Sequence, residues 1–475
     1  MIEEPPVSDV VSHGLREHEP DTGGSRTTEP KPALEFLYNL EDRLPVGRGV
    51  LYGMQHVIIM LPPTALAPVL LSGGLHLSPS LTISIVAATL VAAGLATLLQ
   101  GNGAFGIGAR LPVVQGTELY FLPPLIAIGL VSGTGSIAFC VMFGGLLVCL
   151  ISFFYRHIEK LFPPVVVGTI ITLIGIALIP IGIEQFVGHD TPYYGTSQAF
   201  LVASVTFVCM LVFTIVLRGF LRSIAIVLAI AIGYALSALL GIIDFAPIKE
   251  AAWFGLPHLL PLGFGIPSIT EIILVMLLFV VAAVETTGYI SATSTLVGVE
   301  PSRKRISSGL IADGIGSVVS GALGSTPMTA YAQNLGALSM TRVAARRISV
   351  FAGGLLILLG LVPKFGAVLG TIPTPVLGGV ALLLFGTVAA VGIKTLRPTL
   401  RTERSTVIIA ASLSLGVGFA LVPGEGIAFM STSIALALQT GVAVGGLAAV
   451  ILNLVIPDER TTSPADDTDG AVTGH

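Results

Sequence analysis

The sequence carries little charge for its length. Only 11% of its 475 residues are Asp, Glu, Lys or Arg, whereas 53% are hydrophobic. Soluble globular domains carry about 25% charged residues. The shortage of charge excludes an ordinary soluble protein and predicts a chain that crosses a lipid bilayer several times.

Cysteine and recognisable catalytic motifs are also scarce. Cys140, Cys149 and Cys209 lie within apolar runs without the spacing of metal ligands, so packing is their simplest role. The eight histidines are scattered, and neither HExxH nor Gly-x-Ser-x-Gly occurs. A membrane-embedded enzyme would need a nucleophile–base pair or a metal cluster. We therefore expect no enzymatic activity, no metal and no cofactor.

The two ends of the chain lack helical periodicity. Residues 1–47 are acidic and rich in Pro, Gly, Ser and Thr, and residues 458–475 are similar, so we expect two disordered cytoplasmic tails. The N-terminal tail also lacks the basic and apolar stretches of a cleaved signal peptide. Between the tails, apolar stretches of about 20 residues recur. They predict an all-α membrane protein with 14 spans, several of them broken by Pro and Gly.

The basic residues between the tails gather in every second loop. The intervening loops hold only Lys249 and Lys364, and Arg110 lies within a span. Because basic loops stay in the cytoplasm, this alternation predicts an even number of spans with both termini cytoplasmic. The five basic loops contain Arg156 and Lys160; Arg218 and Arg222; Arg303, Lys304 and Arg305; Arg342, Arg346 and Arg347; and Lys394, Arg397, Arg401 and Arg404.

Two distant segments resemble each other. PVVVGTIITLIG begins at Pro164 and PVLGGVALLLFG begins at Pro375, and their Pro and Gly residues match at a constant offset. Two halves of seven spans each would have opposite orientations in the membrane. Such an inverted repeat is common in secondary transporters, whose binding site lies where broken helices meet at the midplane. Chance agreement between two Gly-rich segments is the alternative.

Two spans are interrupted at corresponding places, the third span of each half. Residues 108–121, GARLPVVQGTELYF, and residues 324–336, GSTPMTAYAQNLG, each begin with a short extended run that contains a proline and then become helical. Irregular backbone at membrane depth survives only inside the protein or beside a cavity. A helix that begins there presents unpaired N–H groups. We therefore expect the Gln333–Asn334 pair at a helix start facing a cavity.

Few ionisable residues lie within the spans, and a charge there costs about 2.5 kcal/mol or more. Glu285 and Asp313 are candidates for function, although Glu285 could instead form an ion pair and Asp313 could cap a backbone break. Tyr289 follows Glu285 by one helical turn, so both should face the same way. The remaining polar candidates and their alternatives are Gln55 and His56, which could link helices by hydrogen bonds, and Arg110 and Glu118, which could pair with each other or lie near the membrane surface.

Several motifs resemble those of the nucleobase–ascorbate transporters, the uracil and xanthine permeases. The signature is QNLGALSMTR at residues 333–342, and the resemblance extends from about Gly49 to Pro457. The supporting motifs are GMQHVIIM at 53–60, LPVVQGT at 111–117, ETTG at 285–288 and ADGIGSVVSGALGSTPMTAYA at 312–332.

The resemblance implies 14 spans in two inverted repeats, forming a core domain (spans 1–4 and 8–11) and a gate domain (spans 5–7 and 12–14). It also implies a homodimer that meets through the gate domains, in the plasma (inner) membrane. In this sequence the core comprises residues 48–160 and 263–372, and the gate comprises residues 161–262 and 373–457.

The resemblance also assigns roles to residues. Glu285 would bind the nucleobase and take part in proton coupling, and Gln333 would hydrogen-bond the base beside the backbone of Ala332. A carboxamide offers one donor and one acceptor in a plane, which suits the N–H/C=O edge of an oxopurine or pyrimidine. Asn334, Asp313, His56 and Gln55 would support the site.

Three residues depart from the family pattern. Tyr289 stands where relatives usually have Asp or His, Leu119 aligns with an aromatic residue that stacks on the base, and Glu118 is an unexpected acid. The substrate signals also differ, because GSTPxTxY resembles uracil permeases whereas Gln333 resembles xanthine and urate carriers.

The sequence thus predicts a proton-coupled importer of a purine such as xanthine or uric acid, working by alternating access. A uracil:proton symporter is the first alternative. A sulfate-carrier-like anion transporter is more remote, because those chains usually carry a folded C-terminal domain, and a channel is also conceivable. We expect a small-molecule nucleobase and the lipid bilayer as partners, and no nucleic acid.

Overall fold

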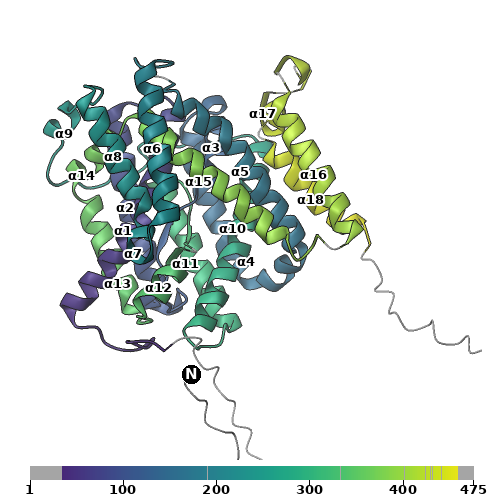
Figure 1. Cartoon of the computed structure of the whole chain (residues 1–475). Helices are drawn as coiled ribbons and strands as arrows, with labels where there is room; N and C mark the ends of the chain where they lie inside the picture. The colour runs from purple at the N-terminus through teal and green to yellow at the C-terminus, as the bar shows by residue number, and fades with distance from the viewer. Residues whose placement is uncertain are drawn as a thin grey trace, which may run out of the picture.

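The computed structural model describes residues 35–189, 191–331, 333–400, 402–422, 424–427, 429–430, 432–439 and 441–457. These residues form a mainly helical molecule with two very short strands (Figure 1). The helices of the first half are α1 Val46–Gly74, α2 Pro79–Asn102, η1 Ala104–Gly106, η2 Leu119–Phe121, α3 Leu122–Val131, α4 Gly135–Leu161, α5 Pro164–Phe186, α6 Ser197–Val216, α7 Gly219–Ser223, α8 Ala225–Leu239 and α9 Ala246–Glu250.

The second half repeats this mainly helical pattern. Its helices are α10 Ile269–Leu296, α11 Arg303–Ala322, α12 Gln333–Thr341, α13 Arg347–Gly360, α14 Pro363–Gly370, α15 Thr374–Leu396, α16 Glu403–Leu421, η3 Gly424–Ile427, α17 Thr432–Gln439 and α18 Val442–Val455. The strands are β1 Gln115–Thr117 and β2 Met328–Ala330, one in each half.

Within the described residues, eight helices are long and apolar enough to cross a membrane. A ninth span is obtained when α13 and α14, which bend by 79° at their junction, are taken together. The segments Leu119–Val131, Ala225–Leu239 and Val442–Val455 are apolar but shorter. The chain is therefore a multi-pass membrane protein, as its composition predicts.

Long helices pack in antiparallel pairs through glycines. A Cβ atom on Gly145 of α4 would lie 2.5 Å from the carbonyl oxygen of Gly314 in α11, and one on Gly314 would lie 2.5 Å from that of Gly145. Gly94 of α2 and Gly353 of α13 face each other in the same way, at 2.6 and 2.7 Å. Because these glycines have no side chains, the two backbones can approach closely. Close approach is how membrane helices gain van der Waals packing energy.

Helices α5 and α15 contain the two similar sequence segments, and they lie against each other (Figure 1). Gly175 of α5 meets Ala389 of α15, whereas Phe186 near the end of α5 meets Gly378 near the start of α15. The two helices therefore run antiparallel, and each glycine leaves room for the backbone of the other helix.

Candidate functional site

The two broken spans meet at the centre of the molecule. Strands β1 and β2 pair antiparallel, with Gln115 opposite Ala330 and Thr117 opposite Met328. Each strand follows a proline, Pro112 or Pro327, and each is followed by a helical segment. The predicted extended breaks are thus confirmed, and their edges satisfy each other's backbone hydrogen bonds inside the protein.

A glycine in β1 makes room for a tyrosine at this crossing. A Cβ atom on Gly116 would lie 2.0 Å from Cε2 of Tyr331 and 2.5 Å from Oγ1 of Thr64 in α1. The hydroxyl of Tyr331 donates a hydrogen bond to the carbonyl oxygen of Thr117. Gly116 therefore allows the Tyr331 ring to lie across β1, and the hydrogen bond fixes the ring there.

Asp313 of α11 joins the first broken span to the surrounding helices. Its Oδ1 accepts hydrogen bonds from Nε2 of Gln100 (2.7 Å) and from Nε2 of Gln115 (2.5 Å). Its Oδ2 accepts one from the hydroxyl of Thr286 (2.5 Å). Asp313 is only 4% exposed and does not line the cavity described next. Its geometry is that of a cross-link between α2, β1, α10 and α11.

A cavity of about 130 Å³ lies beside the crossing, between the core and gate portions predicted from the sequence. It is smaller than the 300–1,000 Å³ typical of sites for drug-sized ligands, so it suits a small molecule. Tyrosine and threonine hydroxyls and two carboxylates supply its polar side-chain groups. The lining residues are Pro63, Thr117, Glu118, Leu119, Tyr120, Ile171, Glu285, Tyr289, Tyr331, Leu384, Thr387, Val388 and Val391.

Glu285 of α10 projects into this cavity. Its Oε2 accepts a hydrogen bond from the hydroxyl of Tyr120, at 3.0 Å. Tyr289, one helical turn later, lines the same cavity, so the prediction that both face one way is confirmed. Carboxylate oxygens accept hydrogen bonds and phenolic hydroxyls can donate or accept them. Together these groups can bind a polar ligand that presents N–H and C=O groups.

Glu118 reaches the same cavity from the end of β1. Its Oε1 accepts a hydrogen bond from the hydroxyl of Thr329 in β2, at 3.3 Å. Arg110, seven residues before Thr117 along the broken span, is exposed, and its carbonyl oxygen and that of Ala109 accept hydrogen bonds from Arg305. These two described side chains, Arg110 and Glu118, form no ion pair with each other. The alternative that they pair is wrong.

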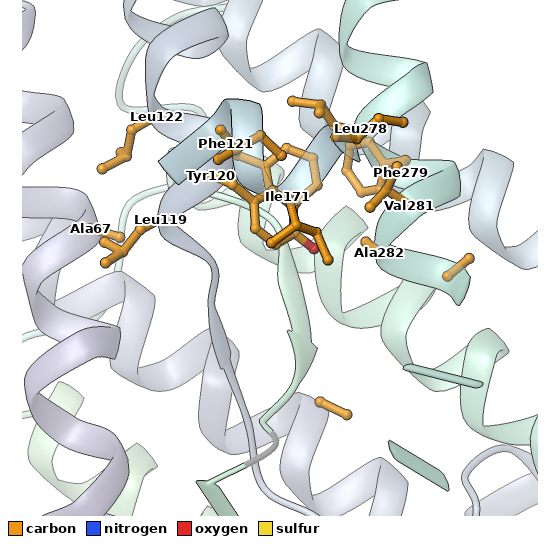
Figure 2. Close-up of a cluster of buried hydrophobic side chains, with 14 of the residues drawn as sticks. Ala67, Leu119, Tyr120, Phe121, Leu122, Ile171, Leu278, Phe279, Val281 and Ala282 are labelled. Atoms are coloured by element: carbon orange, nitrogen blue, oxygen red, sulfur yellow. The ribbon is translucent and has the colours of Figure 1, made fainter. Parts of the chain in front are cut away.

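Tyr120 is a cavity-lining residue, bound to Glu285, that sequence reasoning missed. In Figure 2 the Leu119 side chain points toward Ala67, whereas the Tyr120 ring lies beside Ile171 with its hydroxyl toward α10. Consecutive residues at the start of η2 point in different directions, so the aromatic ring beside Glu285 comes from position 120. The sequence holds the signal, since an aromatic residue directly follows the expected position.

Two polar residues of α1 lie away from the cavity walls. His56 is fully buried, and Gln55 is partly buried with an Oε1 that accepts no hydrogen bond from any described residue. Neither lines the cavity, whereas Pro63 of the same helix does. Any role of Gln55 and His56 in ligand binding is therefore indirect in this conformation.

For Gln333 and Asn334, the structure describes the backbone but not the side chains. Helix α12 begins at Gln333, as expected for a helix start after β2. Ala332 lies outside the described residues, and so do the side chains of Gln333 and Asn334. Tyr331, immediately before them, lines the cavity.

Comparisons with known proteins agree on one family. The model of a permease family, the xanthine/uracil permeases, matches residues 47–425. A protein of Clostridium perfringens named as a purine permease is 34% identical over 90% of this chain and 95% of its own length. The uric acid permease PucJ of Bacillus subtilis is 34% identical over 84% of this chain and 91% of its own. The xanthine permease XanQ of Escherichia coli is 29% identical over 89% and 94%.

Solved structures with the same fold are more distant in sequence. The transmembrane domain of the cyanobacterial bicarbonate transporter BicA aligns with a TM-score of 0.56 at 15% identity, over 86% of this chain and 99% of that domain. The murine anion transporter Slc26a9, in its inward-facing state, aligns with a TM-score of 0.59 at 13% identity, over 88% and 69%. At these identities the likeness concerns the fold alone.

Proposed function

Because the chain belongs to the nucleobase–ascorbate transporter family, whose members are transporters and not enzymes, we propose that it imports a nucleobase through the cavity at the strand crossing. The observation that carries this proposal is the position of Glu285. Its carboxylate faces a small cavity beside the two paired broken spans, near the hydroxyls of Tyr120 and Tyr289.

In the proposed complex, Glu285 accepts hydrogen bonds from N–H groups of the base, and Gln333 forms hydrogen bonds with an adjacent N–H/C=O edge. Tyr120, Tyr289 and Tyr331 supply hydroxyls and aromatic surface around the ring. A base that lacks a matching donor leaves a buried acceptor unpaired, which is where strong discrimination between similar bases arises. Leu119 is a further substrate-binding residue, since it lines the same cavity. Asn334, Asp313, His56 and Gln55 support the site, and Glu118 contributes to ion coupling.

We propose a purine, xanthine or uric acid, as the substrate, with uracil as the alternative. The relatives named for purines, uric acid and xanthine support a purine. We further propose that protons drive uptake and that Glu285 exchanges a proton as the base binds and leaves. An anion transporter of the sulfate-carrier type is less well supported, because the described residues that line the cavity include no Lys, Arg or His.

The proposed frame has 14 spans in two inverted repeats. The packing of the helices supports it. If α4 corresponds to α13 and α2 corresponds to α11, exchanging the two halves converts the α4–α11 pair into the α13–α2 pair. Each of these pairs meets at two opposed glycines. The same exchange maps the α5–α15 pair and the β1–β2 pair onto themselves. A twofold relation in the membrane plane accounts for all four contacts.

The proposed core comprises residues 48–160 and 263–372, and the proposed gate comprises residues 161–262 and 373–457. The cavity supports this division, because Glu285 and Tyr120 come from the core whereas Ile171 and Leu384 come from the gate. Alternating access would then move one portion against the other around the base.

We propose that both termini are cytoplasmic. Near the N-terminus, Glu41 forms an ion pair with Arg346 at 2.9 Å, within a basic loop predicted to be cytoplasmic. Near the C-terminus, Arg404 donates hydrogen bonds to the carbonyl oxygens of Asn453 and Ile456. Each end of the described chain thus contacts a loop that the positive-inside rule places in the cytoplasm.

A homodimer through the gate portions completes the proposal. In each of the gate helices α6 and α16, only 28% of the most apolar 18-residue stretch is buried within the protein. The corresponding share for α2 of the core is 72%. A large apolar surface on the gate is thus available for lipid or for a second copy. Crosslinking of single cysteines placed on α6 and on α16 in native membranes would distinguish the two.

The test is uptake of labelled xanthine and labelled uracil by cells that lack their own nucleobase permeases. We expect saturable xanthine uptake that uric acid competes for and that a proton ionophore abolishes. Uracil uptake without xanthine uptake would establish the alternative substrate. Uptake of sulfate or bicarbonate, with neither base transported, would overturn the proposed function.

A further inference from the structure

Glu118 is an acid that the site does not need for binding a base through Glu285, and its surroundings differ from those of Asp313 and Glu271. We propose that Glu118 is a second proton carrier, so that each base crosses the membrane with two protons, one on Glu118 and one on Glu285. This inference rests on the proposed function of the cavity.

The first argument is the pairing of each carboxylate oxygen. Asp313 has hydrogen-bond donors on both oxygens, and so does Glu271, which accepts from Ser132 on both oxygens and from Ser268 on Oε2. Glu118 and Glu285, by contrast, each accept one hydrogen bond from the described residues, from a hydroxyl to a single carboxylate oxygen. Each therefore has an oxygen with no described donor, and both line the cavity.

The second argument is charge balance. The titratable groups that face Glu118 are Glu285 and Tyr120, together with Tyr289 and Tyr331, and the described cavity lining contains no cation. The positions whose side chains are not described, Gln333 and Asn334, are uncharged. Two ionised carboxylates in a small cavity at membrane depth are costly without a counter-ion. Closure of the site around a neutral base therefore favours a proton on each acid.

The third argument is that the two acids have different hydrogen-bond partners. Glu285 is held by Tyr120 of η2, whereas Glu118 is held by Thr329 of β2. Each carboxyl group thus has its own hydroxyl neighbour from a different element. In the proposed cycle two protons bind from the outer side, one to each carboxylate, and both leave on the inner side with the base. No bond in the base is made or broken.

The experiment measures the number of protons in proteoliposomes of the purified full-length chain. The membrane potential is held at zero with K⁺ and valinomycin, and a tenfold gradient of labelled xanthine is imposed. One proton across one pH unit balances a tenfold gradient, because both equal about 1.4 kcal/mol. With two protons the net xanthine flux stops at about half a pH unit; with one proton it stops at about one unit.

Net xanthine flux is expected to stop at about half a pH unit in wild type and at about one pH unit in Glu118→Gln. The Gln side chain keeps an oxygen that can accept the hydrogen bond from Thr329, but it cannot take up a proton. Glu118→Asp should restore half a unit, and Glu300→Gln, at an exposed acid, should match wild type. Exchange of labelled for unlabelled xanthine, which needs no net proton movement, confirms that Glu118→Gln is folded and binds.

Balance of wild type at one pH unit would overturn the proposal, whatever the variants do. An unchanged half unit in Glu118→Gln would overturn the assignment to Glu118. Both results still require xanthine transport, so they differ from failure of the proposed function, which appears as the absence of base uptake and exchange in wild type.

Discussion

Two groups of acids in this protein have opposite surroundings. Asp313 and Glu271 have hydrogen-bond donors on both oxygens and lie away from the cavity. Glu285 and Glu118 line the cavity, and each is held through one oxygen by one hydroxyl of the described residues. An acid whose hydrogen bonds are complete stabilises the fold. An acid with an oxygen left over can bind a ligand or a proton.

The largest expected effect is at Asp313. Replacing it with Leu leaves Gln100, Gln115 and Thr286 without their acceptor, and each buried unpaired group costs about 1–3 kcal/mol. We expect loss of most folded protein from membranes, measured as the monodisperse fraction after detergent extraction. Glu300→Leu, at an exposed acid, is the control. A well-folded Asp313→Leu variant would show that these hydrogen bonds do not hold the crossing together.

The second effect is at Gly116, which lies between Gln115, a partner of Asp313, and Thr117, a residue of the cavity wall. A methyl group there would overlap the Tyr331 ring, whose hydroxyl is bound to Thr117. Gly116→Ala should therefore displace Tyr331 from the cavity wall and lower xanthine uptake at least tenfold. Gly354→Ala in α13 is the matched control, since nothing lies within 4 Å of its added Cβ atom. Equal uptake by both variants would refute the tight fit.

A smaller effect is expected at Tyr120. The Tyr120→Phe change removes the hydroxyl that donates to Glu285 and keeps the ring. A hydrogen bond contributes about 1 kcal/mol, or about a fivefold change in affinity. We predict a KM for xanthine raised by about that factor, with an unchanged thermal midpoint of the purified protein. A changed thermal midpoint with unchanged KM would make Tyr120 a structural residue.

Much of this arrangement follows from the sequence. The scarcity of charge predicts the membrane, and Pro112 and Pro327 with their extended neighbours predict the two breaks that β1 and β2 form. The spacing of Glu285 and Tyr289 predicts their common face. These features depend on local pattern, which a single sequence carries.

The rest depends on contacts between distant segments. That Asp313 binds Gln100 and Gln115 is set by how α2, β1 and α11 pack, and no local pattern contains it. Likewise, the turn at η2 decides that Tyr120, rather than Leu119, reaches Glu285. The sequence correctly finds the polar residues of the spans, but tertiary packing divides them between structure and site.

The most direct test is the thermal shift that xanthine produces in the purified protein. A ligand that binds only the folded state raises the unfolding temperature with its concentration. The account predicts that xanthine stabilises wild type and that Glu285→Ala, with an unfolding temperature close to that of wild type, shows no such shift. An equal shift in wild type and Glu285→Ala would contradict it, because the base would then bind without the acid that faces the cavity.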